Sequence, residues 1–436
     1  MRLDRVHIEA YRSLYDVTLV PSGFTVLVGP NNAGKTNLSD SLEFLGQIAR
    51  NGLEVAVSRE GGFENLAFRR KRRTRKPVRF ELSATVAVGD VTDQFVLTNE
   101  QNDVPTTEWD DIAIKYSFEL QASSESRDAD FRVITEDLSI ALRSHQTYAD
   151  IEMRRREREV TISCETHIDP SEHGTQVADE LERLSDPFRF ESFASYLEDT
   201  IATTALVLNR LAFNVVVREL LKELGRTRLF QLTPIECRLP GAATPNPELE
   251  RHGANLPAVV RYMQRNHKDA WRATLDAMRG IMPGLTAIET QFTTNRRLAL
   301  LFHERGARAW TSDEVSDGTI QSLALFTCLF DPRVPLALIE EPENSIHPWI
   351  VKMFVDACRR AQDKQIVVTT HSPALIGYLE PSELDVVWRN EGGRTEVASL
   401  EQLDAEAPGL WEAGKLDLYE LIDGGWIRES VPSGLQ

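Results

Sequence analysis

The pattern of apolar and polar residues near the N-terminus predicts two strands and a helix. Residues Arg5–Ala10 alternate between apolar and polar side chains, which is typical of a strand with one buried face. Phe24–Val28 is continuously apolar, as expected for a strand buried on both faces. Asn37–Arg50 carries apolar residues at helical spacing, namely Leu38, Leu42, Leu45 and Ile48. A buried strand, a loop and an amphipathic helix are therefore expected in succession.

The middle of the chain changes from strand-like to helix-like patterns. Between about residues 78 and 168, alternating segments such as VRFELSATVAV and IAIKYSFEL are separated by polar stretches, which indicates an antiparallel meander. Between about residues 180 and 280 the apolar spacing becomes helical. The candidate helices are Phe193–Ile201, Leu211–Leu224, Leu256–Asn266 and Trp271–Ile281.

Alternating strands and helices return after about residue 285. Strands are expected at Pro335–Ile339 and Gln365–Thr369, with helices after Gly318 and over Trp349–Ala361. Alternation of this kind favours a parallel sheet with helices on its faces.

The composition is typical of a globular protein of the cytoplasm. The chain is 42% apolar. Its net charge of −18 opposes nucleic-acid binding by the molecule as a whole but does not exclude binding by a local basic patch. None of its four cysteines forms a CxxC pair, so metal-ligand spacing is absent and a reducing compartment is expected. No signal-peptide pattern opens the chain, and the most apolar stretch, Thr204–Val217, is too short to span a membrane.

The segment Gly29-Pro-Asn-Asn-Ala-Gly34-Lys35-Thr36 matches the P-loop pattern in full. It follows the predicted buried strand and opens the predicted helix, so backbone N–H groups and the positive end of the helix converge on a polyphosphate. Lys35 is suited to pair with the β- and γ-phosphates, and the Thr36 hydroxyl is suited to ligate Mg²⁺. The predicted nucleotide contacts are Gly29, Asn31, Asn32, Gly34, Lys35, Thr36 and Asn37. The alternative is a glycine-containing turn that fits the pattern by chance.

Three further candidate motifs lie downstream of the P-loop pattern. Ser316-Asp-Gly318 precedes an apolar helix and can form an anion site at the helix start. An apolar strand ends in Glu340 and Glu341, which are suited to hold Mg²⁺ and to activate water respectively. His371 ends the next strand and can position that water. The alternatives are an ordinary helix cap, solvated carboxylates at a strand end and a structural histidine.

These elements, in this order, resemble the ABC ATPase superfamily, and within it the AAA-type ATPases of the RecF/SMC/OLD branch. The segments that carry the resemblance are VHIEAYRSLYDVTL, GPNNAGKTN, SDGTIQSLAL, LIEEPENSIHP and TTHSP. LTPIECRLPG followed by HGANLPAVV is similar to a feature of stand-alone predicted ATPases of this branch. The short tail after His371 argues against an appended TOPRIM nuclease, and the lack of heptads argues against long coiled-coil arms.

The resemblance implies an α/β fold in which an ABC-type P-loop ATPase head is interrupted by an antiparallel β meander and a helical insertion. The head would comprise residues 1–100 and 286–436, and the insertion 101–285. ATP and Mg²⁺ would be the cofactors. In a head-to-tail homodimer, Ser316 and Gly318 of one copy would close over the ATP that is bound to the P-loop of the other copy. Arg12 would lie near the nucleotide, and Asn344–His347 at the dimer seam.

Two positions depart from the family pattern or remain unassigned. The metal-binding acid is Glu340, where most of the superfamily has aspartate. The glutamine that usually ligates Mg²⁺ from a separate loop is not identified by the sequence.

A dense basic run stands out against the acidic chain. It consists of Arg69, Arg70, Lys71, Arg72, Arg73, Arg75 and Lys76. Such a run can neutralise several DNA phosphates without reading sequence. A surface for an acidic protein partner and a solvated hairpin loop are alternatives. A shorter run, Arg154–Arg158, contains an acidic residue.

These features favour an ATP-driven, DNA-associated switch or clamp. By analogy with the branch it resembles, it would work with an effector protein such as a nuclease in anti-phage defence or DNA repair. The alternative is a nucleotide-gated scaffold or sensor that has no nucleic-acid role. A GTPase or small-molecule kinase is disfavoured, because no NKxD-type guanine reader is evident.

Overall fold

The structure is a computed structural model of the 436-residue chain. It describes residues 1–68, 76–87, 111–123, 130–144, 147–167, 194–198, 200–212, 214–423 and 427. The described residues form two compact units. Unit 1 comprises Met1–Pro21, Phe44–Arg226 and Asn390–Glu396, and unit 2 comprises Ser22–Glu43, Thr227–Arg389 and Val397–Gln436. Each unit contains residues from all three of the ranges into which the sequence analysis divides the chain, namely 1–100, 101–285 and 286–436.

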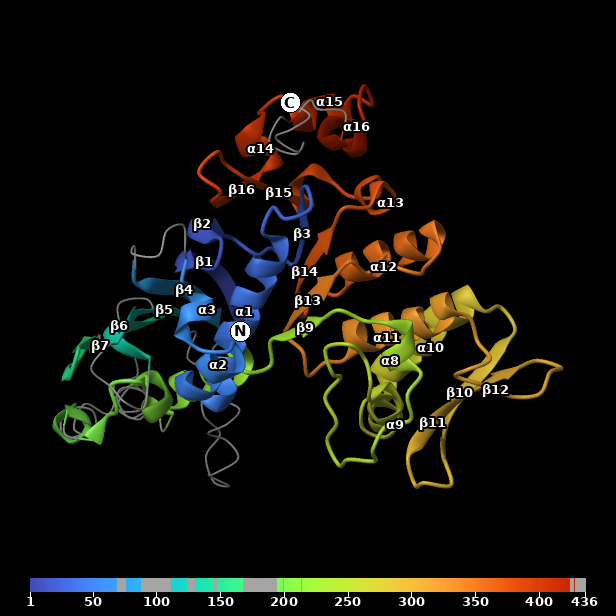
Figure 1. Cartoon of the computed structure of the whole chain (residues 1–436), viewed down its shortest axis with the longest axis horizontal. Helices are drawn as coiled ribbons and strands as arrows, with labels where there is room; N and C mark the ends of the chain where they lie inside the picture. The colour runs from blue at the N-terminus through green and yellow to red at the C-terminus, as the bar shows by residue number, and fades with distance from the viewer. Residues whose placement is uncertain are drawn as a thin grey trace. The chain divides into compact units, whose positions relative to one another are not determined.

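Unit 1 is built on an antiparallel sheet (Figure 1). Its strands lie in the order β8, β7, β6, β5, β4, β1 and β2. Their bounds are β1 Arg2–Tyr11, β2 Leu14–Leu19, β4 Val78–Val86, β5 Ile112–Ala122, β6 Phe131–Ser144, β7 Thr147–Arg156 and β8 Glu159–His167. The predicted antiparallel meander is therefore confirmed. It includes one strand, β7, that the sequence pattern did not indicate.

One face of this sheet is apolar because side chains along each strand alternate between the two faces. Along β4, buried and half-buried residues alternate without interruption. Phe80 of β4 packs against Tyr11, Phe118 and Phe44, with ring centroids 5.4–5.8 Å apart within this group. Phe44 belongs to α1, which spans Lys35–Asn51. This aromatic cluster anchors the C-terminal half of α1 to the sheet of unit 1.

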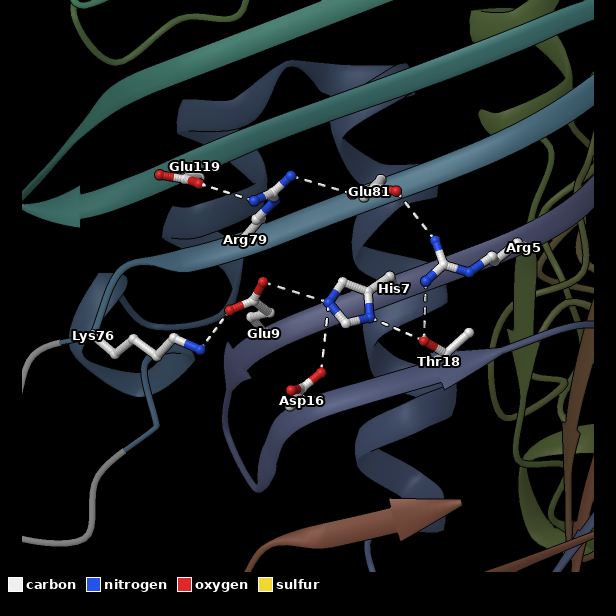
Figure 2. Close-up of polar contacts among 9 residues, drawn as sticks. All are labelled: Arg5, His7, Glu9, Asp16, Thr18, Lys76, Arg79, Glu81 and Glu119. Carbon is white, nitrogen blue, oxygen red and sulfur yellow. Dashed lines mark hydrogen bonds and ion pairs between the residues drawn. The ribbon is translucent and has the colours of Figure 1, made fainter. Parts of the chain in front are cut away.

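The opposite face carries charged side chains and one threonine that pair across neighbouring strands (Figure 2). They are Arg5, His7, Glu9, Asp16, Thr18, Lys76, Arg79, Glu81 and Glu119. His7 accepts or donates a hydrogen bond with Thr18 at 2.9 Å, and its other ring nitrogen lies 3.4 Å from Glu9. Lys76 also pairs with Glu9 and lies over the ring of Tyr15. Cross-strand pairs of opposite charge stabilise a solvated sheet face modestly.

Short helices complete unit 1. They are α2 Leu53–Arg59, α3 Phe63–Leu66, the 3₁₀ helix η1 Leu208–Leu211 and α7 Val215–Leu224. The sequence predicted a helix from Leu211, but α7 begins at Val215. The reason is Asn214, whose side chain accepts hydrogen bonds from the backbone N–H groups of Val216 and Val217 and so caps the helix. Of the predicted helix at Phe193–Ile201, residues 194–198 and 200 are helical, and Phe193 and Asp199 lie outside the described residues.

Unit 2 is built on a parallel sheet, as the alternating pattern predicted. Its strand order is β15, β3, β14, β13 and β9. The strands are β3 Phe24–Val28, β9 Arg228–Phe230, β13 Leu336–Glu340, β14 Gln365–Thr370 and β15 Leu384–Arg389. β3, β13 and β14 are buried along their whole length. This burial explains their continuous apolar sequences.

The helices of unit 2 enclose an apolar core beside this sheet (Figure 1). They include α8 Pro234–Cys237, α9 Leu256–Asn266, α10 Lys268–Ile281, α11 Asp317–Phe330, α12 Pro348–Arg360 and α13 Pro373–Ile376. A second sheet contains β10 Leu285–Phe292, β11 Leu298–Glu304 and β12 Trp310–Thr311. The remaining elements are η2 Pro381–Glu383, β16 Thr395–Ser399, α14 Leu400–Leu403, α15 Ala407–Glu412 and α16 Leu418–Asp423. None of the helices in the described part of the chain has the length and apolarity needed to cross a bilayer.

The shorter basic run lies mostly in β7, and its central arginine is buried. Arg155 lies 3.8 Å from Glu136 of β6, and both side chains are inaccessible to solvent. Arg155 also donates hydrogen bonds to the carbonyls of Glu157, Ala202 and Ala205. Burial raises the pKa of Glu136, and hydrogen bonds from the backbone N–H groups of Leu208 and Val207 oppose that shift. The pair therefore ties the meander to the segment that leads into η1.

We predict that Arg155→Ala destabilises the meander, because it leaves the Glu136 carboxylate buried without its counter-charge. Breaking a buried ion pair on one side typically costs about 3–5 kcal/mol. Hydrogen exchange of the β6 and β7 amides should accelerate accordingly. Arg156→Ala is the matched control, because Arg156 pairs with Asp137 on the exposed surface. Equal exchange rates in the two variants would contradict this role for Arg155.

Candidate functional site

The P-loop connects the end of β3 to the start of α1, as the sequence predicted. Gly29 and Gly34 have φ values of 150° and 115°, and Asn32 has a φ of 66°. A Cβ atom at position 29 would lie 1.9 Å from the carbonyl oxygen of Val387 in β15. Glycine is therefore required there for two reasons, its φ value and the close approach of a neighbouring strand.

Lys35 is held against the loop that precedes it. Its Nζ donates hydrogen bonds to the carbonyls of Gly29 at 2.7 Å and Pro30 at 3.2 Å. Burial lowers the pKa of Lys35, while the negative charges of Glu341, Glu343 and Glu340 oppose that shift. The ammonium group thus lies at the base of the loop within the field of three carboxylates.

The paired acids at the end of β13 occupy different environments. Glu340 is buried, and burial raises the pKa of its carboxyl, although the nearby Thr36 hydroxyl and Arg251 guanidinium oppose the shift. Glu341 has a φ of 45°, and its N–H donates to the carbonyl of Thr369 at 2.9 Å. The strand therefore turns at Glu341, which leaves this carboxylate accessible.

Glu341 is contacted on both of its carboxylate oxygens. Oε1 lies 3.2 Å from Nδ1 of His371, and Oε2 accepts a hydrogen bond from the Asn344 amide at 3.0 Å. Glu343 lies nearby and accepts a hydrogen bond from Thr370 at 2.6 Å. The predicted water-activating acid and the predicted water-positioning histidine are thus direct neighbours.

The P-loop and the paired acids line a cavity of about 230 Å³ in unit 2, and His371 reaches it through its contact with Glu341. It is lined by Asn31, Asn32, Ala33, Gly34, Lys35, Thr36, Asn37, Gln231, Glu340, Glu341, Thr369 and Arg389. The lining includes each predicted P-loop contact except Gly29, whose carbonyl binds Lys35, and it includes both acids. Ser316 and Gly318 do not belong to it.

Ser316 caps α11, the helix that begins with the Ser-Asp-Gly motif. Its hydroxyl accepts a hydrogen bond from the N–H of Thr319 at 3.2 Å. Asp317 accepts a hydrogen bond from Arg238 at 2.6 Å. A Cβ atom at Gly318 would lie 2.8 Å from the carbonyl oxygen of Ser345, so the motif packs closely on the loop that follows the paired acids.

Arg12 and Lys76 belong to unit 1. Arg12 follows β1 with a φ of 48°, and its guanidinium pairs with Glu60. Lys76 pairs with Glu9. The rest of the predicted basic run, Arg69, Arg70, Lys71, Arg72, Arg73 and Arg75, lies outside the described residues.

Comparison with known proteins identifies the family. The profile of the family described as "AAA domain, putative AbiEii toxin, Type IV TA system" matches residues 24–377. The chain belongs to this AAA domain family. The predicted ABC-type AAA ATPase is therefore confirmed, and the protein binds and hydrolyses ATP. No curated protein matches the chain.

Solved structures of SMC heads share a broad similarity with the AAA domain protein. An SMC head bound to the C-winged helix domain of ScpA matches with a TM-score of 0.48 and 13% identity, covering 92% of this chain and 99% of that one. The SMC head domain from Thermotoga maritima matches with a TM-score of 0.40 and 12% identity, covering 92% and 100%. The Pyrococcus furiosus Smc head bound to the C-terminal domain of ScpA matches with a TM-score of 0.45 and 13% identity, covering 95% and 100%.

Two residues of the AAA domain cavity, Gln231 and Arg389, were not anticipated from the sequence. Gln231 follows β9, which runs parallel to β13 with Phe230 opposite Ile339. Because β9 has three residues, it is too short to give a recognisable periodicity. Arg389 ends β15, whose partner in the sheet is the P-loop strand β3. Sequence alone does not specify which strand pairs with β3.

Asp385 of β15 introduces a pH-dependent cost beside the P-loop strand of the AAA domain. It lies opposite Leu27, and burial raises its pKa to about 6. A carboxyl whose folded pKa is raised is tolerated when protonated and destabilises the fold once it ionises. Stability is therefore lost as the pH rises through about 6.

We predict that Asp385→Asn stabilises the AAA domain protein much more at pH 8 than at pH 4.5. The gain at pH 8 is expected to be roughly 2–3 kcal/mol, from the difference between the usual aspartate pKa and about 6. Thermal unfolding at several pH values measures it, with Asp313→Asn at an exposed position as the control. A gain that is the same at both pH values would contradict the raised pKa.

Proposed function

We propose that the protein is an ATP-driven switch that closes as a head-to-tail homodimer around two nucleotides. The composition of the cavity supports this proposal, because the P-loop and the paired acids of one chain line the cavity while Ser316 and Gly318 of the same chain do not. A second copy arranged head to tail would supply these two residues to the bound ATP. Sites completed by a partner copy make nucleotide binding and dimerisation mutually dependent.

The residues of the cavity fit a Mg²⁺–nucleotide complex. Among the described residues, Glu340 Oε1 is a buried carboxylate oxygen that accepts no hydrogen bond, and Glu340 lines the P-loop cavity together with Thr36. Hard oxygen ligands of this kind suit Mg²⁺. Thr36 and Glu340 would hold the ion, with Gln231 as the additional ligand that the family pattern expects. When bound, Mg²⁺ would neutralise charge on the β- and γ-phosphates.

The chain's own groups would perform the remaining steps. The loop N–H groups and Lys35 would bind the phosphates, since donors and a cation converge there. Glu341 would accept a proton from the water that attacks the γ-phosphorus. Asn344 and His371 would orient that carboxylate, because they contact its two oxygens.

We predict that Glu341→Gln retains ATP binding, slows turnover by roughly 10²–10⁴-fold and accumulates the ATP-bound dimer. Light scattering after gel filtration, with and without ATP, measures the dimer. In the same background, Ser316→Arg should bind ATP but remain monomeric, because the added side chain would occupy the seam. Lys35→Ala should lose nucleotide binding. A dimer that forms equally well in the Ser316→Arg variant would contradict the head-to-tail arrangement.

We further propose that the switch acts on DNA together with an effector protein. The support is the basic run that ends at Lys76, on a chain whose net charge is −18. Its described end is fixed to the sheet of unit 1 through Glu9 and Tyr15. The description of the matching family, which names a toxin system, agrees with a defence role.

We predict that double-stranded DNA stimulates ATP hydrolysis and that the stimulation fades with salt. Each phosphate contact should contribute about −0.9 to the slope of log affinity against log salt. Neutralising Arg69–Arg73 and Arg75 with glutamine should abolish the stimulation, measured as the ratio of rates with and without DNA. Arg154→Gln with Arg156→Gln is the control, because both arginines pair with acids. Stimulation that survives in the first variant would contradict a role for the basic run, whereas hydrolysis by the unaltered protein that is indifferent to DNA would favour the scaffold alternative.

A further inference from the structure

One arginine outside the P-loop cavity lining bridges two acids next to the metal position. Nη1 of Arg251 lies 3.3 Å from Asp40 Oδ1, and Nη2 lies 3.4 Å from Glu340 Oε2. Asp40 belongs to α1, one helical turn after the P-loop, and Glu340 ends β13. A single guanidinium therefore contacts a predicted Mg²⁺ ligand and a second carboxylate beside it.

The carboxylates need a counter-charge at this position. The side chains of Glu340 and Asp40 are 4% and 14% exposed, whereas the side chain of Arg251 is 40% exposed. Two carboxylates that are largely removed from water repel each other unless a cation lies between them. Arg251 provides one positive charge, and a divalent cation at Glu340 would provide two. Both cations need the same carboxylate.

The contacts of Arg251 are of a kind that a metal ion can replace. Charge-assisted N–H···O hydrogen bonds are typically about 2.7–2.9 Å long, and both bridges are longer. The exposed side chain also has solvent into which it can turn. By contrast, a direct oxygen contact to Mg²⁺ offers a strong, short-range attraction.

The backbone of Arg251 is fixed to the loop that carries Gln231. The N–H of Gln231 donates to the carbonyl of Arg251 at 2.8 Å, and the carbonyl of Gln231 lies 2.8 Å from Nδ1 of His252. The N–H of Thr233 donates to the carbonyl of His252 at 3.3 Å. Movement of the Arg251 side chain can therefore occur while its backbone remains beside the cavity.

We propose that Arg251 is a resident counter-ion of the metal site, which holds Asp40 and Glu340 together before the metal arrives and competes with it for Glu340. This inference rests on the proposed Mg²⁺ role of Glu340. Arg251 thereby sets the divalent-cation concentration at which the site fills. It acts through Glu340 and is a positioning residue, not a catalytic one.

The test is a titration of the full chain with Mn²⁺ at saturating ADP. Electron paramagnetic resonance measures the fraction of Mn²⁺ that is bound. Arg251→Met should bind Mn²⁺ roughly two- to fivefold more tightly, the range expected when a half-exposed competing ion pair is removed. Arg251→Lys keeps the charge but cannot reach both acids equally, so its affinity should be intermediate. Arg279→Met is the matched control, because Arg279 pairs with Asp276 on the exposed side of α10.

A second measurement separates competition from a purely structural ion pair. Without divalent cations, Arg251→Met should lower the melting temperature, because the two carboxylates then lose the cation that bridges them, and Mg²⁺ should restore it. A loss of stability that Mg²⁺ does not reverse, together with unchanged or weaker Mn²⁺ binding, would overturn the inference. If Arg251→Met is poorly folded, the Mn²⁺ affinity of Arg251→Lys decides in the same way.

Glu340→Gln distinguishes failure of this inference from failure of the proposed metal site. If Mn²⁺ binding weakens in Glu340→Gln and Arg251→Met has no further effect in that background, the two residues act on one another as proposed. If binding depends on Glu340 but is the same with and without Arg251, only the inference fails. If binding is indifferent to Glu340, the metal site itself is misplaced and the inference fails with it.

Discussion

The parallel alignment of strands in unit 2 brings all of the cavity's chemistry to one edge of a sheet. Val28 lies opposite Thr370, Thr369 lies opposite Glu340, and Ile339 lies opposite Phe230. Residues that follow these strand ends therefore meet although they are far apart in sequence. Ligands of open α/β sheets bind outside the carboxyl ends of the strands for this reason. A shift in register of β13 or β14 would separate the acids and His371 from the P-loop.

The backbone at the end of β13 gives two adjacent glutamates opposite environments. Glu340 remains within the buried strand, where desolvation raises its pKa and favours neutralisation by a cation. Glu341 adopts a positive φ, which is sparsely populated for residues other than glycine, asparagine and aspartate. The surrounding contacts to Thr369, His371 and Asn344 hold it there. Strain at this residue separates the buried carboxylate of Glu340, the proposed metal ligand, from the accessible carboxylate of Glu341 that is suited to proton transfer.

The sequence predicted those parts of the molecule that depend on local pattern. The P-loop, the buried strands and the acids at a strand end each have a motif or a periodicity, and the structure places them as expected. Gln231 and Arg389 have neither. Gln231 reaches the cavity only because β9 pairs with β13, and Arg389 because β15 pairs with β3. Strand order is a property of the whole sheet, so no local signal identifies these residues.

The charge pattern of the sequence was the least reliable predictor of what a charged residue does. The environment of a charge depends on the partners that the fold brings to it. Arg154, Arg155 and Arg156 form a basic run in sequence, yet in β7 each has an acidic partner, and Arg155 is buried. Arg251 is an isolated cation with no motif around its charge, yet it bridges two acids beside the proposed metal site. The sequence shows how many charges a segment carries. Which carboxylate each cation faces is decided by tertiary structure, and that pairing determines whether an arginine stabilises a sheet, binds phosphate or competes with a metal ion.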